Sequence, residues 1–493
     1  MGIIEKQATR SAMYSYLGVG LGFLTVVWLS HVLSAQENGA IRTLMSYSLL
    51  FAQFANLGFS GITNRFFPYF RNKEKGHHGF LFYAMIVAGI GFILTSIIFL
   101  FLKDKIVEDN IAKSPLFVSH LFYIVPLSLF TVFFYIFDSY LRANFSSVIG
   151  PFTKDLLQRI LILIAILLYY LGFFDFDNFI LLYIVIICLP TLILLFFTIY
   201  IKEWHVKPSK DPIYKQYRAE MMKFGLYSIL TSGAVAIVSQ IDAIMINSML
   251  GEAKTGIYGI AFYFGTIILI PAHMIYRVSS PVVAELLKKE QMEGIHSIYK
   301  KSCNIQFAIG LLLFIGIWVN INNIMQILPK EYETGKNVIL VLTIGYLIEM
   351  ATGINQVIII NSKYYRFDAY IIALSVVVVI ISNYIFIPIY GIMGSAIATA
   401  LTFSINNVIR WLFLYFKFNM QPYDFNIIKL VGIAIVGFLS GYFLPDMKNT
   451  ILDIAVRSSI VSGVFILLIL KTEAAPELNY KIRKNLKRFS INL

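Results

Sequence analysis

The sequence predicts an all-α integral membrane protein of about fourteen transmembrane helices, built as two six-helix lobes followed by two appended C-terminal helices. Composition supports this, because 58% of the 493 residues are hydrophobic and only 14% are charged, against roughly 45–50% and 25% in soluble domains. Long apolar runs also recur along the whole chain, and their order repeats in the second half.

The apolar runs are long enough to cross a bilayer. A hydrocarbon core of roughly 30 Å requires about 17 to 25 helical residues. The runs that meet this requirement lie at approximately 10–33, 41–64, 80–102, 117–141, 153–171, 179–201, 224–250, 256–280, 303–321, 337–360, 367–387, 392–418, 427–444 and 450–470.

Basic residues predict the orientation. They are concentrated in alternate loops, for example at Arg71, Lys73 and Lys75 after the second run, whereas the other loops are short and nearly neutral. Since cytoplasmic loops carry the excess of Lys and Arg, we expect both termini in the cytoplasm, with no cleavable signal. The net charge of +13 is therefore explained by topology, and we expect no nucleic-acid partner.

The sequence lacks the features that are typical of several other classes of function. Loops are short, which leaves no extramembrane catalytic domain, and no GxxxxGK[ST] phosphate-binding motif is present. Cys188 and Cys303 are isolated in apolar surroundings, so neither a disulfide nor a metal site is predicted. We expect a protein that is not an enzyme and needs no cofactor, although it could couple to H⁺ or Na⁺.

The repeat becomes visible when the chain is shifted by 217 residues, which places Lys6 on Lys223 and Gly39 on Gly256. A tight outer turn then recurs between two spans. Because each copy holds six spans, both copies enter the bilayer in the same direction, as in transporters with parallel repeats. The predicted domains are an N-terminal lobe at 1–201, a linker at 202–223, a C-terminal lobe at 224–418, and two helices with a basic tail at 419–493.

Three motifs resemble those of a known transporter family. They are the aspartate-bearing segment from Gln240 to Gly251 with its following Gly-x-Tyr turn, the segment from Asn383 to Thr399 with its Pro-x-Tyr-Gly pattern, and the run from Leu57 to Arg65. Together, in the order in which they occur along the chain, they resemble the polysaccharide transporters, the Wzx-type lipid-linked oligosaccharide flippases of the MOP superfamily.

This resemblance implies alternating-access transport of a polyprenyl-pyrophosphate-linked oligosaccharide, the repeat unit of an O-antigen, capsule or exopolysaccharide. The cargo would move from the cytoplasmic to the periplasmic leaflet of a bacterial inner membrane. The partners it implies are the lipid-linked glycan and other polysaccharide assembly proteins. A cation-coupled exporter of drugs or metabolites from the same superfamily is the alternative. An intramembrane enzyme would need a convergent catalytic set, which the sequence lacks.

Four arginines are candidates for binding an anionic head group. Arg10, Arg65 and Arg277 lie toward the cytoplasmic ends of spans one, two and eight, and Arg410 lies deeper in span twelve. Guanidinium groups match phosphate oxygens bidentately. The alternative for Arg10, Arg65 and Arg277 is an interfacial side chain that extends its charge to water, which is less favourable for Arg410 because of its depth.

Asp242, Glu349 and His273 are candidates for coupling or gating. A charge at bilayer depth costs roughly 2.5 to 3.5 kcal/mol on insertion scales, so such residues usually face a cavity or a partner. The alternative for Asp242 is a structural partner to a cation on a neighbouring helix, and the alternative for Glu349 and His273 is a hydrogen-bonded structural role. The pairs Asp138–Arg142, Asp155–Arg159 and Asp453–Arg457 are spaced i to i+4 and are interpreted as structural ion pairs.

Overall fold

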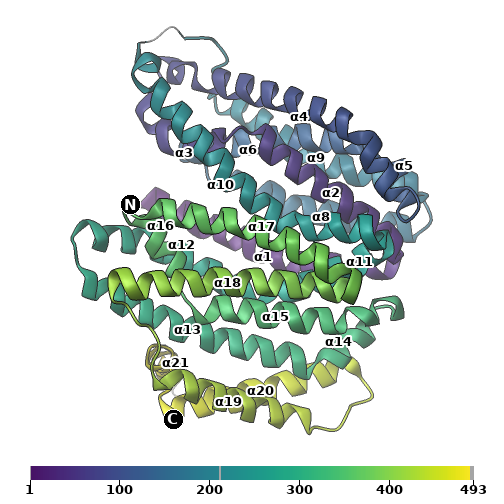
Figure 1. Cartoon of the computed structure of the whole chain (residues 1–493), viewed down its shortest axis with the longest axis vertical. Helices are drawn as coiled ribbons and strands as arrows, with labels where there is room; N and C mark the ends of the chain where they lie inside the picture. The colour runs from purple at the N-terminus through teal and green to yellow at the C-terminus, as the bar shows by residue number, and fades with distance from the viewer. Residues whose placement is uncertain (1, 210–211, 489–493) are drawn as a thin grey trace. The chain divides into compact units, whose positions relative to one another are not determined.

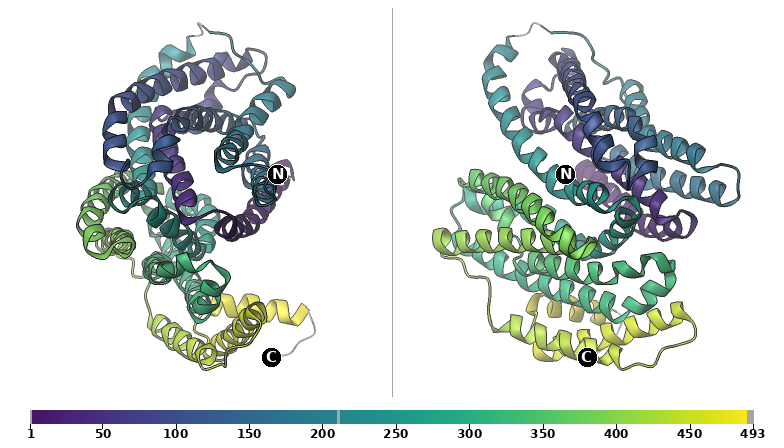
Figure 2. Two further views of the ribbon diagram at one scale, coloured as in Figure 1. Left: turned by 90° about the vertical axis from the view of Figure 1, so that its right-hand side faces the viewer. Right: turned by 45° about the vertical axis from the view of Figure 1, so that its right-hand side comes forward.

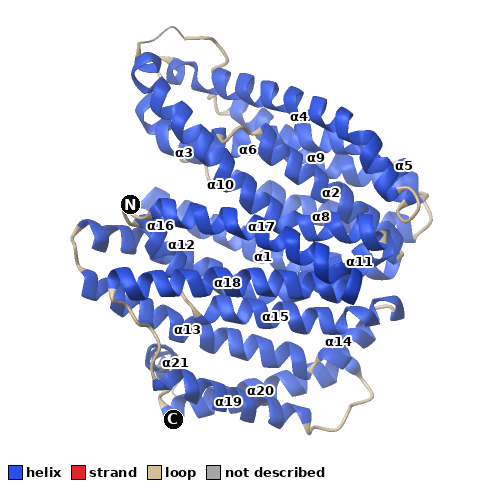
Figure 3. Ribbon diagram, viewed as in Figure 1, coloured by secondary structure: helices blue, strands red, loops and turns tan. Residues whose placement is uncertain are grey.

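The computed structural model describes residues 2–209 and 212–488 (Figure 1). Every regular element in this part of the chain is a helix (Figure 3), which confirms the predicted all-α class. Residues 210 and 211 of the predicted linker and the last five residues of the basic tail lie outside the described residues.

The chain divides into two compact units, Met1–Gly259 and Ile260–Leu493, called here the first and the second unit. The six-plus-six division with its linker and appended pair stays a prediction. The helices up to the unit boundary are α1 (Gly2–Val32), α2 (Ala35–Ala55), α3 (Phe59–Phe70), η1 (Gly76–Gly79), α4 (Phe80–Asn110), α5 (Pro115–Ser119), η2 (Leu121–Tyr123), α6 (Ile124–Ala143), α7 (Ile149–Pro151), η3 (Phe152–Leu157), α8 (Gln158–Tyr170), α9 (Phe176–Tyr200), α10 (Ile213–Leu250) and α11 (Glu252–Thr266), which continues past it.

The second unit contains the remainder of α11 and the helices that follow. These are η4 (Ile267–Leu269), α12 (Ile270–Lys288), α13 (Met292–Val319), α14 (Ile321–Ile327), η5 (Lys330–Gly335), α15 (Lys336–Ala351), α16 (Asn355–Asn361), α17 (Tyr365–Tyr390), α18 (Ile392–Phe418), α19 (Phe425–Tyr442), α20 (Thr450–Thr472) and α21 (Pro476–Arg488).

The protein is a multi-pass membrane protein, with 12 helical segments among the described residues that are long and apolar enough to span a bilayer. The predicted count of fourteen is not confirmed. The predicted span 41–64 is divided, because α2 ends at Ala55 and α3 begins after Gly58, whose φ of 70° is left-handed. In the predicted span 153–171 a π-helical turn precedes α8, which has only 13 residues.

α4 shows how these helices are suited to a bilayer. Its buried positions include Ala84, Ala88, Gly91, Thr95 and Phe99, which recur every three or four residues and form one helical face. Between Ile86 and Leu102 the exposed positions are also apolar. Small residues on the buried face let helices approach closely, as is common in membranes. The opposite face is left for lipid.

α19 and α20 pack side by side at the C-terminal end of the second unit (Figure 2). Arg457 on α20 pairs with Asp453 at 2.9 Å and donates a hydrogen bond to the carbonyl of Gly441 on α19 at 2.8 Å. This confirms the predicted structural pair Asp453–Arg457. The pair Asp138–Arg142 on α6 is confirmed as well, at 2.6 Å.

Candidate transport site

The turn before α2 brings two repeat-related glycines together in the first unit. Ser34 and Glu37 form a capping box that starts α2. Gly39 and Gly256 are each the fifth residue of their helices, α2 and α11. A Cβ on Gly39 would overlap the carbonyl oxygen of Glu252, and one on Gly256 would overlap that of Ala35. The two helices therefore cross with their backbones in contact.

The turn between α10 and α11 is also bound to the end of α4. The Asn247 amide donates to Asn110 Oδ1 at 2.7 Å, and Lys113 Nζ donates to the carbonyl of Met249 at 2.7 Å. Glu252 accepts a hydrogen bond from the backbone N–H of Phe117 at 3.1 Å. The hydrogen bonds of Asn247 and Glu252 are buried, and leaving a buried polar group without a partner is costly, so this end of the first unit is held together firmly.

Asp242 lies on α10 with 4% of its surface exposed. The hydroxyl of Tyr258 on α11 donates to its Oδ2 at 2.7 Å. The predicted coupling residue is therefore buried and hydrogen-bonded. In the sequence this tyrosine stood out only as part of a turn motif, and its contact with Asp242 was not predicted.

Arg10 and Arg65 are both exposed in the first unit. The Arg65 guanidinium lies 4.7 Å from the ring centroid of Phe224, which connects α3 to α10. A cation over an aromatic face is attracted by the ring quadrupole and still leaves N–H donors for an anion.

Glu349 on α15 is part of a buried polar network in the second unit. It accepts hydrogen bonds from the hydroxyl of Tyr276 on α12, at 2.7 Å, and from the amide of Asn407 on α18. Asn407 in turn accepts from the hydroxyl of Thr352 at 2.7 Å and from the amide of Asn355 at 3.1 Å. Three helices are thus joined around one carboxyl group.

Arg410 is adjacent to this network and is already paired. Its Nε lies 2.8 Å from Asp368 Oδ1 on α17, and the two residues are 5% and 2% exposed. The Gln356 amide donates to the other Asp368 oxygen at 3.3 Å. Asp368 was not among the predicted site residues, because its contact with Arg410 joins two helices and does not follow from sequence spacing.

His273 and Arg277 are exposed on α12, one turn apart. The ring centroid of His273 lies 6.4 Å from that of Tyr276, whose hydroxyl donates to Glu349. The second unit thus brings His273, Arg277 and Glu349 close together. Whether these residues, or Arg10, Arg65, Arg410 and Asp242, contact a substrate or an ion stays a prediction.

A cluster of polar side chains that was not predicted lies between η1 and the segment after α9. His77 Nε2 is 2.7 Å from Glu203 Oε2, and Lys73 Nζ is 2.7 Å from Glu203 Oε1. In the sequence, the only feature that points to this cluster is that His77 and His205 lie close to basic residues of two loops. The cluster fixes the loop between α3 and α4 to the end of α9.

With His205, this cluster has the donor types of a metal site, since the three ligand atoms lie within 4.8 Å of one another. The hydrogen bonds oppose that interpretation. His77 Nδ1 accepts the backbone N–H of Asn72 at 3.1 Å, so the proton of a neutral ring sits on Nε2 and is donated to Glu203. No lone pair is then left on Nε2 for a metal.

Glu203 gives this cluster a pH dependence. Burial opposes its ionisation, but hydrogen bonds from Lys73 and His77 outweigh burial and hold the pKa of the carboxyl below its ordinary value of 4.5. A lowered pKa stabilises the fold above the unfolded pKa, and that contribution is lost as the pH falls through the folded pKa.

We expect Glu203→Gln to lower stability by about 1–3 kcal/mol at pH 7 and to have a smaller effect near pH 4. Thermal melts of the purified variant at both pH values test this, and an equal loss at both would contradict it.

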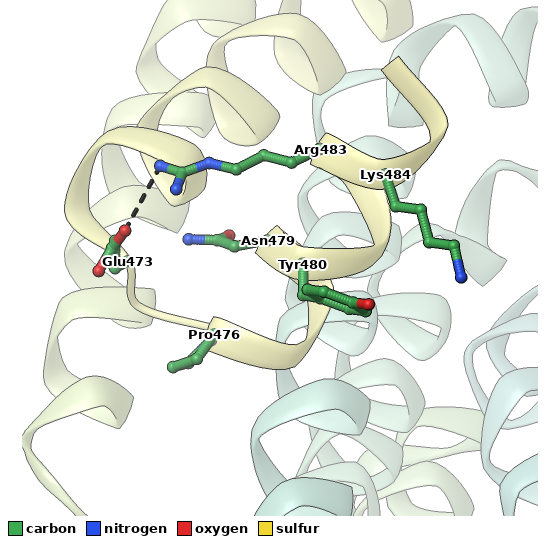
Figure 4. A pocket seen from close by; sticks show the side chains of 6 residues that line it. All are labelled: Glu473, Pro476, Asn479, Tyr480, Arg483 and Lys484. Carbon is green, nitrogen blue, oxygen red and sulfur yellow. Dashed lines mark ion pairs between the residues drawn. The ribbon is translucent and has the colours of Figure 1, made fainter. Parts of the chain in front are cut away.

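A separate hollow of about 500 Å³ lies where α21 follows α20. Figure 4 shows Arg483 extending toward Glu473, to which it pairs at 3.4 Å. Lys484 and Tyr480 also line the hollow. It shares no residue with the networks around Asp242 or Glu349, so we do not assign it to the candidate site.

A model of the polysaccharide biosynthesis protein family matches residues 6–287, which is more than half of the chain. The chain belongs to this family. A second model, MatE, matches residues 228–385. The predicted resemblance to polysaccharide transporters of the MOP superfamily is thereby confirmed.

Two curated relatives of this polysaccharide biosynthesis protein are archaeal. One is a probable low-salt glycan biosynthesis flippase of Haloferax volcanii, 24% identical over 47% of this chain and 50% of its own. The other is an uncharacterized membrane protein of Methanocaldococcus jannaschii, 26% identical over 40% of this chain and 46% of its own. The chain spans about half the length of the curated relatives it matches.

Solved structures show the fold of this polysaccharide biosynthesis protein. The lipid II flippase MurJ in an inward closed conformation has a TM-score of 0.75 at 14% identity and covers 94% of this chain and 98% of its own. An inward-facing multidrug resistance MATE transporter of the MOP superfamily has a TM-score of 0.64 at 14% identity, with 82% and 94% covered. Relatives with a stated activity are thus flippases and transporters.

Proposed function

We propose that the protein is a flippase that moves a polyprenyl-pyrophosphate-linked oligosaccharide from the cytoplasmic to the outer leaflet. The observation that carries this proposal is the match of the polysaccharide biosynthesis family to residues 6–287. Coverage supports it, since the lipid II flippase aligns with 94% of the chain and the multidrug transporter with 82%. The repeat unit of an O-antigen, capsule or exopolysaccharide is the proposed cargo, in a bacterial inner membrane with both termini cytoplasmic.

The proposed mechanism is alternating access. The contact of Gly39 with α11 and the hydrogen bonds of Asn247 and Glu252 close the outer end of the first unit. The head group enters from the cytoplasm and leaves after this end opens. An inside-negative potential favours outward movement of an anion by roughly 2.3 kcal/mol per charge per 100 mV, so ATP is not required.

The exposed arginines are the best suited to bind the pyrophosphate. Arg65 and Arg277 are exposed, and an anion can reach them without breaking any ion pair between residues that the structure describes. Arg410 would first have to leave Asp368, its partner at 2.8 Å. We therefore rank Arg65 and Arg277 above Arg410 in the head-group site.

Glu349 and Asp242 are the proposed coupling residues. Each accepts a hydrogen bond from a tyrosine hydroxyl, Tyr276 and Tyr258 respectively, at 2.7 Å. A proton or Na⁺ on either carboxylate would compete with this bond and loosen the contact between two helices. Glu349→Gln should therefore reduce transport in the vesicle assay below. Its amide retains an acceptor oxygen for Tyr276 but turns an NH2 group toward the Asn407 amide, so we expect some loss of stability as well.

The proposal is tested in vesicles that contain the purified protein and a polyprenyl-pyrophosphate-linked oligosaccharide. A lectin added outside reports how much glycan is accessible in the outer leaflet. We expect accessibility to rise with the protein, and to rise more slowly with Arg277→Gln than with the control Lys289→Gln, which replaces a cation beyond α12. If the protein leaves glycan accessibility unchanged, the flippase proposal is wrong.

A cation-coupled exporter is the second candidate. The MatE model over residues 228–385 and the likeness to multidrug transporters favour it. Efflux of a cationic dye from the same vesicles, driven by a proton or Na⁺ gradient, would support it if glycan accessibility did not change. Arg65 and Arg277 oppose this function, because exposed cations repel a cationic drug.

A further inference from the structure

An apolar groove of about 660 Å³ runs along the first unit between α3, α4 and α10. Its walls are hydrocarbon and aromatic side chains, and Arg218 supplies a charge at one end. Residues that line it include Phe59, Ile62, Val87, Met222, Leu226 and Ile229. Met222 and Leu226 are 64% and 63% exposed. The groove is therefore open along its length and offers apolar surface to an occupant.

The length of α10 places the charged end of the groove at the membrane surface. α10 has 38 residues, which is roughly 57 Å at 1.5 Å per residue, while a bilayer with its head groups is about 40–45 Å thick. Arg218 is near the start of the helix and lies roughly 48 Å from Leu250 along its axis. Arg218 thus reaches the head-group layer opposite the turn that follows Leu250, and the apolar part of the groove runs from there toward the hydrocarbon.

Two hydrogen bonds hold the groove in shape at the charged end. The hydroxyl of Tyr83 on α4 donates to the carbonyl of Ser209 at 2.7 Å, and the hydroxyl of Tyr214 on α10 donates to the carbonyl of His78 at 3.0 Å. Both tyrosines line the groove. Since their polar groups are bonded to backbone, the tyrosines present ring surface to an occupant and fix the distance between its walls.

We propose that this groove binds one acyl chain of an anionic phospholipid, with the lipid phosphate paired to Arg218. The lipid comes from the leaflet where α10 begins, which is the cytoplasmic leaflet in the orientation proposed above. An occupant must combine an anionic head at the interface with a hydrocarbon chain that enters the membrane, and a phospholipid of this leaflet has both. The lipid connects α4 to α10 where none of the side chains that the structure describes fills the space between them.

The test uses the full-length protein purified in detergent, exposed to phosphatidylglycerol or phosphatidylcholine and examined by native mass spectrometry. Wild type should retain phosphatidylglycerol in preference to phosphatidylcholine. Arg218→Gln should weaken retention of phosphatidylglycerol about fivefold, as expected for one basic residue near an anionic surface. The control Lys215→Gln changes an exposed cation on the preceding turn that does not line the groove, and it should retain wild-type binding.

A second pair of variants tests the hydrocarbon part of the groove. Met222→Trp places a larger ring in the groove from an exposed position and should displace lipid, whereas Leu230→Trp changes an equally exposed residue of α10 outside the lining, at 66% exposure. Equal retention by both variants would overturn the proposal. Preferential retention of polyprenyl phosphate over phosphatidylglycerol would also overturn it, and would assign the groove to the transported lipid instead.

Discussion

Replacing Gly39 by alanine is expected to destabilise the protein by about 3 kcal/mol or more, the largest effect of any single methyl group that we predict. The added Cβ would overlap the carbonyl oxygen of Glu252 on α11. That oxygen is backbone and cannot rotate away, so α2 and α11 must separate. Gly256→Ala should have the same effect, because its Cβ would overlap the carbonyl of Ala35. Melting of the purified variants, followed by the loss of monodisperse protein on size exclusion, measures this.

Gly89→Ala on α4 is the matched control. A Cβ at Gly89 would meet no atom within 4 Å, and alanine is favoured over glycine in a helix by about 1 kcal/mol. This variant should therefore be as stable as wild type or more stable. If Gly39→Ala melts like Gly89→Ala, the close crossing of α2 and α11 is not required, and the proposed closure at this end loses its support.

Much of the fold follows from the sequence because it depends on local pattern. Apolar runs predicted most of the spanning helices, and the pairs Asp138–Arg142 and Asp453–Arg457 follow from helical spacing alone. The shift of 217 residues aligned Gly39 with Gly256. Their direct contact was not predicted, since a repeat shows which residues correspond and gives no distance between them.

The candidate site was only partly predictable because its contacts join distant segments. Asp368 and Arg410 are 42 residues apart, Tyr276 and Glu349 are 73 apart, and each contact depends on how two helices are rotated. Arg410 and Glu349 were singled out in the sequence as charges at bilayer depth, and the rule that such charges need a partner was correct. It gave no means of choosing the partner.

Local departures of the backbone from α-helical geometry also limited what the sequence could predict. The second predicted span is divided at Gly58, whose left-handed φ interrupts the helix. Asp155 lies in the π-helical turn Phe152–Leu157, where residues i and i+4 no longer have α-helical spacing, and it accepts a hydrogen bond from Ser15 on α1 at 2.7 Å. The predicted pair Asp155–Arg159 assumed a regular helix and stays a prediction.

Asp368→Asn is the second substitution expected to have a large effect. It leaves the Arg410 guanidinium buried without a counter-charge, and breaking a buried pair in this way costs about 3–5 kcal/mol. Arg410→Met should cost less, because Asp368 can take up a proton and become neutral whereas arginine cannot lose one. Chemical or thermal unfolding of the purified variants in detergent gives the order of these effects.

The double variant Asp368→Asn with Arg410→Met tests whether the two side chains stabilise the protein as a pair or independently of each other. Both charges are then absent, the oxygen of the introduced asparagine side chain can still accept from Gln356, and we expect stability to return to within about 1–2 kcal/mol of wild type. Glu285→Gln is the control, because Glu285 and Lys289 form an ion pair of 2.5 Å whose side chains are 64% and 56% exposed, and it should leave the melting temperature unchanged. A double variant whose loss equals the sum of the two single losses would show that Asp368 and Arg410 are not coupled. We expect this contrast because the Asp368–Arg410 pair is buried and the Glu285–Lys289 pair is exposed, although the charged atoms are similarly close in both.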